Sequence, residues 1–444
     1  MPSNPTDISD LPGLLKPVFG ELQFLLPEES LVQKLFSFKA GDSVGKYFQE
    51  PIEVRAPWSI SWCGNSGDSA TFADALPSKT QDVQVTPYLV VLRNQVSYGV
   101  FDRAPKDAAS KAFMAAGAYF GKSMATQLRR NLELSMLCGQ DGFGVVESAD
   151  DSADTITIDA ASFRPGWVSI LEGAQVCLRV VNSTTTLRAL TLTVSAVNVE
   201  TRTLSFSGTP NLSTVQGGDT LFLLTSAGDG VSSTTLVYNE MVGLRKQVSE
   251  QTATVFNVAK STYSAFRGNV VTSVGAMSPG ALLNIVTKAV NRGFQGKAIA
   301  LLSPKAWNVL NNRIVSQQIF NQQSPDPAVS AKLGTDSIEV KAMGVTLEVV
   351  PHPYQAEGEI LVLPKDYVKR IGSSYAAISG DTTGVTGAAK KEVDIDITFA
   401  IPAAPLLYIL PIVGSSTVEL QCRSDQQVYL QRPAWSVLGT GVTY

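Results

Sequence analysis

The sequence has few of the residues from which active sites are usually built. Its 444 residues include a single histidine, His352, so a Ser/His/Asp or Cys/His catalytic system would have to use that residue. A histidine-based metal cluster is excluded by the count. His352 follows the alternating segment TLEVV and lies between two prolines. We therefore interpret it as a satisfied or exposed loop histidine.

Cysteine is also sparse. The four cysteines, Cys63, Cys138, Cys177 and Cys422, are far apart in the sequence and form no CxxC pair. Zinc sites usually show paired ligands at short spacing. We expect buried, reduced thiols.

Long apolar runs and basic runs are both absent. No stretch of about 18 apolar residues could span a membrane, and no secretory signal opens the chain, which favours synthesis in a cytoplasm. The net charge is −4 and the pI is about 5.3. Without clustered Lys and Arg, direct reading of a nucleic-acid sequence is not expected.

Familiar nucleotide and carboxylate motifs are incomplete. No GxxxxGK[ST] is present, GAYFG at 117–121 lies inside a helical pattern, and GQDGFG at 139–144 follows a helix instead of opening one. The carboxylates Asp150, Asp151, Asp154, Asp394 and Asp396 leave glycosidase or metal roles open, but solvated faces explain them better.

One long amphipathic helix is predicted over 104–139. Pro105 and Asp107 suit its first turn, and Gly139 is placed to end it. Such a helix would be roughly 50 Å long. Its apolar stripe repeats at steps of three and four and consists of Phe113, Ala116, Gly117, Phe120, Met124, Leu128 and Leu132.

Two unusual segments precede this helix. Residues 1–50 combine polar stretches with apolar clusters broken by prolines, which favours an extended arm. Residues 51–103 are predicted to form a long hairpin with a return strand over 83–101, each arm reaching roughly 40 Å. An isolated two-stranded hairpin is marginal in water, so we expect it to lie on its own chain or on a neighbouring subunit.

The remainder alternates between helical and β-patterned blocks, which favours the α+β class. Residues 150–225 contain short alternating strands and indicate a small inserted β-barrel or sandwich. Further predictions are helices at 235–250, at 279–292 with Ser278 as N-cap and Gly293 as stop, from 304, and at 365–372; a buried strand at 297–303; a hairpin at 337–351 turning at Gly344; and strands at 357–364, 393–401, 405–413, 416–422 and 426–431.

The order of these elements resembles the HK97-type major capsid proteins of tailed double-stranded DNA phages. The resemblance rests on the arm, the hairpin, the long helix, and the segments SPGALLNIVTKAVNRGFQGKAIALLSPKAWNVL, EVKAMGVTLEVVPHP, EGEILVLPKDYVKRI and QQVYLQRPAWSVLGTGV. It implies an N-terminal arm (1–50), an E-loop (51–103), the spine helix of a P domain (104–149), the inserted β domain (150–225), an A-domain region (226–335) and remaining P- and A-domain strands (336–444).

The resemblance also implies a function. The chain would self-assemble as hexamers and pentamers into an icosahedral virion shell around packaged DNA, contacted non-specifically. It would be made in a host bacterial cytoplasm, with no membrane, catalytic residue, cofactor or metal. A separate scaffolding protein, a portal and possible decoration proteins would be its partners. Lys79, near the hairpin tip, is a candidate for the covalent cross-link found in the prototype of the family.

Other readings stay open. The same fold could form an encapsulin-type compartment around protein cargo. A β-rich carbohydrate-active enzyme or adhesin could use Trp58, Trp62, Trp167 or Asp394. A tail tube or sheath protein is a third alternative, which would give helical tubes instead of closed shells.

Overall fold

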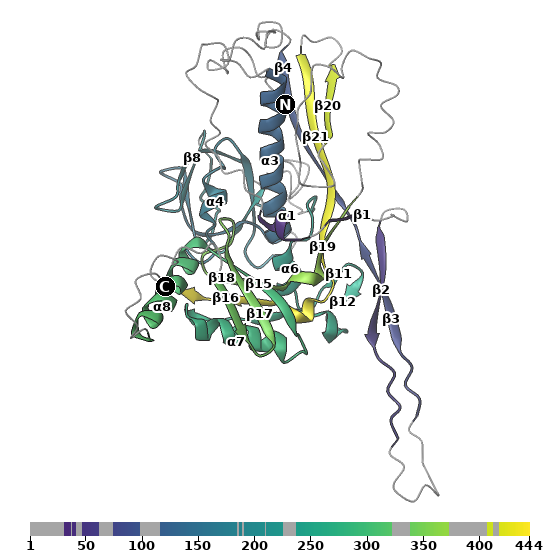
Figure 1. Cartoon of the computed structure of the whole chain (residues 1–444). Coiled ribbons are helices and arrows are strands. Elements are labelled where there is room, and N and C mark those ends of the chain that lie inside the picture. Colours follow the sequence, from purple (N-terminus) through teal and green to yellow (C-terminus); the bar gives the residue numbers. More distant parts are fainter. Residues whose placement is uncertain are drawn as a thin grey trace, which may run out of the picture. The chain divides into compact units, whose positions relative to one another are not determined.

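The computed structural model describes residues 31–36, 38–40, 47–61, 74–97, 116–183, 186–188, 191–208, 210–224, 237–321, 338–372, 406–411 and 417–444. The chain divides into two compact units (Figure 1). One comprises residues 1–41, 87–243 and 369–428, and the other 42–86, 244–368 and 429–444. Both contain helices and strands, which confirms the α+β class.

The first unit is built around helix α3 (Ala116–Cys138). Met124, Leu128 and Leu132 are buried on one face, as the apolar stripe predicted. The start predicted at 104 and the stripe residue Phe113 lie outside the described residues. The buried carboxylate of Glu133 accepts the backbone N–H groups of Val32 and Gln33, which anchors the short helix α1 (Leu31–Leu35) to α3.

A sheet accompanies α3 in this unit. It contains β1 (Phe38–Ala40), β19 (Val368–Gly372), β21 (Thr417–Leu430) and β20 (Leu406–Pro411) in that order, and β4 (Tyr88–Ser97) pairs with β21. β1 and β19 are parallel, whereas β20 and β4 run antiparallel to β21.

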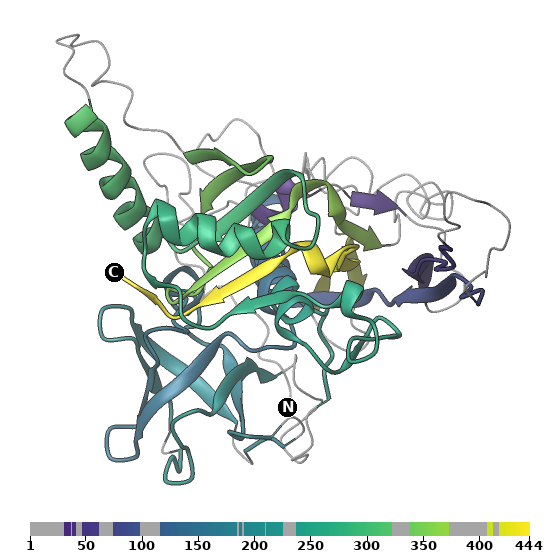
Figure 2. The same cartoon turned by 90° about the horizontal axis from the view of Figure 1, so that it is seen from below.

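The predicted inserted β domain is a closed barrel, seen in teal in Figure 2. Its strand order is β10 (Thr220–Leu223), β5 (Gly144–Asp150), β6 (Thr155–Ile158), β9 (Thr203–Phe206), β8 (Leu192–Asn198) and β7 (Gln175–Arg179), with the short helix α4 (Pro165–Val168) between β6 and β7. Alternate residues of β6 and β9 are buried, so the period-two pattern fills the barrel interior. The barrel begins at Gly144, six residues before the predicted boundary, because β5 follows almost directly on α3.

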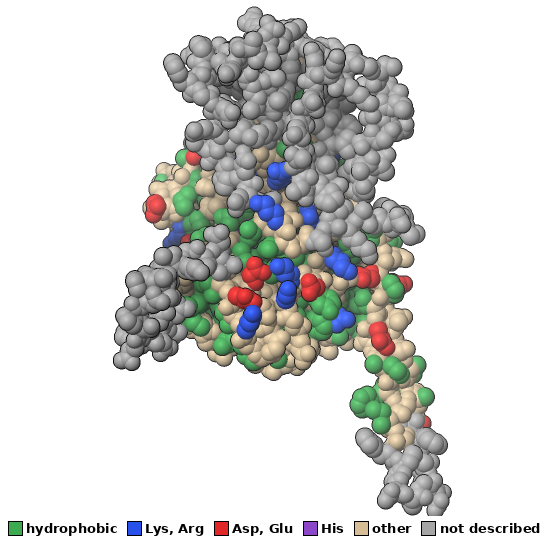
Figure 3. All heavy atoms as spheres, in the orientation of Figure 1, with side chains coloured by type: hydrophobic (Ala, Val, Ile, Leu, Met, Phe, Trp, Pro, Cys, Tyr) green, Lys and Arg blue, Asp and Glu red, His purple; other side chains and the backbone are tan. Residues whose placement is uncertain are grey.

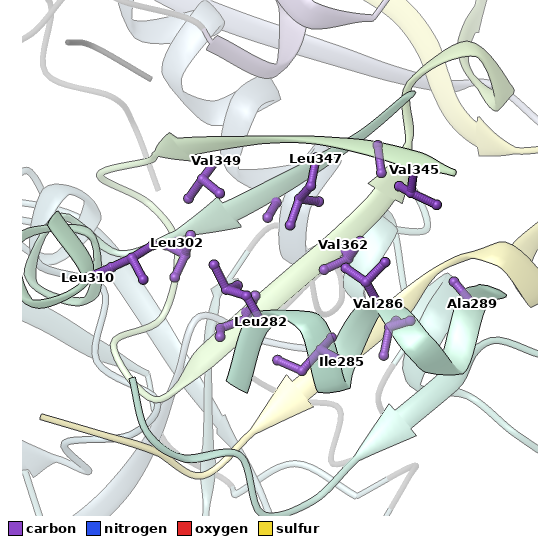
Figure 4. Close-up of a cluster of buried hydrophobic side chains, with 14 of the residues drawn as sticks. Leu282, Ile285, Val286, Ala289, Leu302, Leu310, Val345, Leu347, Val349 and Val362 are labelled. Carbon is purple, nitrogen blue, oxygen red and sulfur yellow. The ribbon is translucent and has the colours of Figure 1, made fainter. Parts of the chain in front are cut away.

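The second unit contains a six-stranded sheet in the order β13 (Asn269–Val271), β22 (Val437–Thr440), β18 (Glu359–Pro364), β15 (Gly296–Leu302), β17 (Val345–Pro351) and β16 (Ile338–Ala342). Helices α7 (Pro279–Val290) and α8 (Pro304–Asn321) contribute Leu282, Ile285 and Leu310 to the core over it (Figure 4). Shorter elements are α6 (Leu244–Ser249), β11 (Thr254–Val255), β12 (Val258–Ala259), η2 (Ser264–Phe266), β14 (Gly275–Ala276), η4 (Lys365–Tyr367), η6 (Pro433–Trp435) and β23 (Val442–Thr443).

Several predicted elements of this unit are confirmed. The Ser278 hydroxyl accepts the N–H of Ala281, and Gly293 has a φ of 84° after α7. β15 is buried as expected, and β16 and β17 turn through Met343 and Gly344, both with positive φ, which is the geometry of a type I′ hairpin turn.

Five predicted elements differ from the structure. Of the predicted helix over 235–250, the described part, 237–250, is helical only in α6. The predicted helix at 365–372 is the 3₁₀ turn η4 followed by strand β19. The strands at 416–422 and 426–431 are one strand, β21. The return strand over 83–101 is two strands, β3 (Lys79–Val85) and β4, in different sheets, because Pro87 lacks the N–H that would continue the ladder.

Candidate assembly interface

The candidate site is the hairpin formed by β2 (Phe48–Arg55) and β3 in the second unit. The strands pair antiparallel from Phe48↔Val85 out to Arg55↔Lys79. Beyond them, an isolated bridge joins Trp58 and Leu76, with the Trp58 N–H donating to the Leu76 carbonyl at 3.0 Å. The pairing therefore extends outward past the last ladder position.

The root of the hairpin is held by the β11–β12 turn. The N–H of Gln84 donates to the Phe256 carbonyl at 3.0 Å, and the side chains of Gln81 and Asn257 add bonds to the Asn257 and Asp82 carbonyls. Phe256 and Asn257 have φ values of 50° and 66°, and this conformation is strained for Phe. Such strain persists only where the surroundings fix it, so the root is a rigid base.

A buried lysine ties this turn to α6. The Lys260 ammonium donates to the carbonyls of Gln247 and Glu250. These carbonyls lie at the C-terminal end of α6, where a cation also complements the helix dipole. Burial lowers the pKa of Lys260 to about 8. The turn, helix and hairpin root thus form one connected support.

The outer hairpin exposes large apolar side chains. Trp58 is 67% exposed, Ile60 57% and Leu76 42%. Figure 3 shows hydrophobic side chains along this projecting segment. Isolated exposed hydrophobic residues are ordinary, but three on one two-stranded projection mark a surface suited to association.

A second exposed strip lies on β4 in the first unit. Leu89 and Val91 are exposed, and Arg93 makes a bidentate ion pair with Glu419 on β21, at 2.7 and 2.6 Å. These hydrogen bonds, and a further one from Gln421, lower the pKa of Glu419 to about 2. This face therefore combines apolar and paired charged side chains.

The histidine and cysteine interpretations are confirmed for the residues described. His352 is 1% exposed, and its Nδ1 accepts the N–H of Tyr354 at 3.1 Å. Cys138, Cys177 and Cys422 are buried free thiols. Burial raises the pKa of Cys177 and Cys422 to about 12, so both stay protonated and unreactive.

The described acidic candidates have structural roles. Asp150 accepts N–H groups from Ser152 and Ala153 in the β5–β6 turn, and Asp151 accepts the N–H of Leu212. Asp154 has a φ of 52° in that turn. The structure does not bring these carboxylates together as a catalytic pair.

Neither Lys79 nor Trp167 lies where its proposed role requires. Lys79 lies at the start of β3, inside the Trp58–Leu76 bridge, with its ammonium over the Tyr263 ring, so it is not at the tip. Trp167 is 2% exposed and packs edge-on against Phe143, which removes it from any sugar-binding surface. The remaining candidates Trp62, Cys63, Asp394 and Asp396 and the arm residues 1–30 lie outside the described residues.

No metal or membrane feature appears in the part of the chain that the structure describes. Its His, Cys, Asp and Glu side chains form no group of three or more that could hold a metal ion. None of its helices combines the length and apolar character needed to cross a membrane.

The second unit contains a cleft of about 870 Å³ that was not predicted from the sequence. Its lining comes from β2 and from segments around Phe266, Arg292, Tyr367 and Trp435, which lie far apart in the sequence. No local motif could have indicated it, because the walls meet only through tertiary packing.

Comparisons with known proteins give structural likeness only. Neither the known family models nor the curated proteins include a match. The capsid asymmetric unit of cyanophage A-1(L) is 10% identical, with 97% of both chains covered and a TM-score of 0.52. The capsid of the native GTA particle is 8% identical (96% of this chain, 95% of that chain, TM-score 0.46), as is the holo-SrpI encapsulin complex from Synechococcus elongatus PCC 7942 (96% and 95%, TM-score 0.39).

Proposed function

We propose that this chain, which has the HK97-type capsid fold, is the subunit of an icosahedral virion shell. Copies associate into hexamers and pentamers that close around packaged double-stranded DNA. In this proposal the β2–β3 hairpin is the E-loop, α3 with the long sheet is the P domain, and the six-stranded sheet belongs to the A domain. The role is structural and uses no catalytic residue.

The observation that carries this proposal is the supported hairpin with an apolar outer end. Burying a Trp, Ile or Leu side chain contributes about 1.5–3 kcal/mol each. Association costs at least about 4 kcal/mol in lost translational and rotational freedom, so one arm alone would bind weakly. Several arms engaged at once in a closed assembly raise the effective concentration and make the contact stable.

The net charge of the chain is compatible with a shell that encloses DNA without binding it tightly. A net charge of −4 provides no general attraction for phosphate. Assembly and filling would then depend on partners. A scaffolding protein would direct shell formation, a portal would admit DNA, and decoration proteins would bind the surface of the shell. Expression in the cytoplasm of a host bacterium completes this proposal.

Electron microscopy of the purified full-length protein, expressed with and without its neighbouring genes, tests the proposal. Closed shells with five- and six-fold clusters would support it, and nuclease-protected DNA inside would distinguish a virion shell from a protein-cargo compartment. A monodisperse monomer under every condition, or helical tubes, would contradict it.

A matched pair of variants connects the shells to the hairpin. Replacing Trp58, Ile60 and Leu76 by serine should reduce shell yield at least about tenfold while the protein stays folded. Serine at Val237 and Met343, which are 55% and 47% exposed elsewhere, is the control and should leave the yield unchanged. Equal yields from both variants would show that the hairpin surface is not used.

A further inference from the structure

Lys260 places a fully buried amine beside the root of the hairpin. It directly follows β12 and is 0% exposed. Among the residues described, the three N–H donors of its charged form find only two acceptors, the carbonyls of Gln247 and Glu250. The Glu250 carboxylate instead accepts the N–H groups of Thr252 and Ala253. Burying an ammonium with an unused donor is costly, because water would have satisfied all three.

The neutral amine fits the same site without that cost. An uncharged lysine has two N–H donors, which is the number of carbonyls that Lys260 reaches. Both hydrogen bonds to the end of α6 therefore survive loss of the proton. The dipole of α6 favours the cation at this end, but burial has the larger effect, because the pKa of Lys260 falls to about 8.

The charged groups around Lys260 oppose each other. The carboxylate of Glu250 raises the pKa of Lys260, whereas the guanidinium of Arg267, which donates to the Lys260 carbonyl at 3.0 Å, lowers it. Burial therefore decides the direction of the shift. The other charged residues on the described elements packed here are Lys79 and Asp82 on β3 and Arg245 and Lys246 on α6.

One short segment connects this site to the hairpin. The N–H of Lys260 donates to the Ala253 carbonyl at 3.3 Å, at the base of the β11–β12 turn. At the other end of the turn, the Phe256 carbonyl accepts the N–H of Gln84 on β3. When the Lys260 side chain leaves α6 for water, the turn loses its tie to the helix, and the hydrogen bond of Gln84 opens with it.

We infer that closure of the hairpin root is linked to a proton on Lys260, so that the root closes more firmly as the pH rises from 7 to 9. An open root exposes Lys260 and returns its pKa to the ordinary 10.5, whereas the closed root lowers it to about 8. The open state therefore binds more protons between these values, and raising the pH favours the closed state. The two values give an open fraction about tenfold smaller at pH 9 than at pH 7. This property belongs to the single chain, whether or not copies assemble.

Amide exchange at Gln84 measures the opening in the full-length protein. At each pH the intrinsic exchange rate of this amide is the same in wild type and in Lys260→Met, so the ratio of the two measured rates cancels catalysis by hydroxide. The wild-type rate relative to Lys260→Met should fall about tenfold from pH 7 to pH 9, because only the wild type carries the proton. Lys288→Met, on the exposed side of α7, is the control and should exchange as wild type at both pH values.

Glu250→Gln gives a second test that leaves Lys260 in place. Glutamine keeps an oxygen that can accept the N–H groups of Thr252 and Ala253, but it lacks the charge that favours the ammonium. The pKa of Lys260, followed by NMR of its ¹³C-labelled side chain, should be about 8 in wild type and lower in Glu250→Gln. A Gln84 rate ratio that stays constant from pH 7 to pH 9, or a wild-type pKa of Lys260 near the ordinary 10.5, would overturn the inference. Neither result depends on shell formation, so the proposed function stands or falls separately.

Discussion

At the scale of single residues, two glycines permit a close crossing in the first unit. The N–H of Gly243 donates to the carbonyl of Gly139 at 3.0 Å just after α3. A Cβ on Gly243 would lie 2.4 Å from the Gly139 nitrogen, and one on Gly139 would lie 2.2 Å from the Met241 carbonyl oxygen. The sequence correctly placed the helix end at Gly139, but the reason differs: the left-handed residue is Gln140, with a φ of 62°.

This crossing gives a stability prediction. Gly243→Ala forces backbone to move, so it should destabilise the protein by about 1–3 kcal/mol, measured by urea unfolding. Gly280→Ala is the control, because its Cβ would meet nothing closer than the Ser278 hydroxyl at 3.9 Å. That change lies within α7 and should be neutral or stabilising by up to about 1 kcal/mol. Similar stabilities for the two variants would contradict the close approach.

The Arg93–Glu419 pair predicts a pH dependence. The folded-state pKa of Glu419 is about 2, below the ordinary value of 4.5, so the pair stabilises the fold fully above pH 4.5. That contribution is lost as the pH falls from 4.5 towards 2. Because the Arg93 side chain is 60% exposed, the effect should be modest and weakened by salt.

The measurement compares wild type with Glu419→Gln. The advantage of wild type in unfolding free energy should be greatest above pH 4.5 and should shrink steadily at lower pH. Gln421→Ala keeps the ion pair and should retain most of the pH dependence. A constant difference between wild type and Glu419→Gln across this range would show that the ion pair does not form.

At the scale of elements, local signals predicted what depends on local chemistry. Helix α7 has Ser278, Pro279 and Gly293 at its ends, and the β16–β17 turn has Gly344. Capping and positive φ are properties of a few adjacent residues, so these elements could be placed from the sequence.

The wrong elements are those that distant partners determine. Val242 exchanges hydrogen bonds with the Gln427 side chain, so its backbone does not join the predicted helix over 235–250. Residues 368–372 form strand β19, and β1 pairs in parallel with 370–372 of it. Neither partner can be recognised from the local pattern, since hydrogen bonds across such sequence separations depend on the assembled fold.

The two ends of the barrel segment lie close together, which predicts that the rest of the chain can fold without the barrel. The Gln140 N–H donates to the Glu240 carboxylate at 2.7 Å, so the chain leaves and returns to nearly the same place. Replacing 142–238 by a Gly/Ser linker of about three residues should leave the rest of the chain folded, with the unfolding transition preserved. Loss of cooperative unfolding would contradict this. If the variant folds and also forms shells, the barrel is dispensable for assembly.

At the scale of the whole molecule, the sequence predicted that the hairpin needs support from its own chain or from a neighbouring subunit, but not which residues provide it. A long hairpin without its own sheet requires support, and the structure supplies this at the root while leaving Trp58 and Leu76 exposed. The cleft with Arg432 combines segments that are hundreds of residues apart. Such a cleft therefore becomes visible only when the fold is complete.

The net charge of −4 gives the prediction for the whole molecule. Unassembled protein should not retain duplex DNA in a mobility-shift measurement at about 0.15 M salt, because retention requires many Lys or Arg contacts to phosphate. Lowering the salt should produce at most a weak shift. Shells made without packaging partners should accordingly be free of nucleic acid, as judged by their ultraviolet absorbance ratio. Tight binding with a steep salt dependence would indicate a basic inner surface and would contradict a shell that encloses DNA without gripping it.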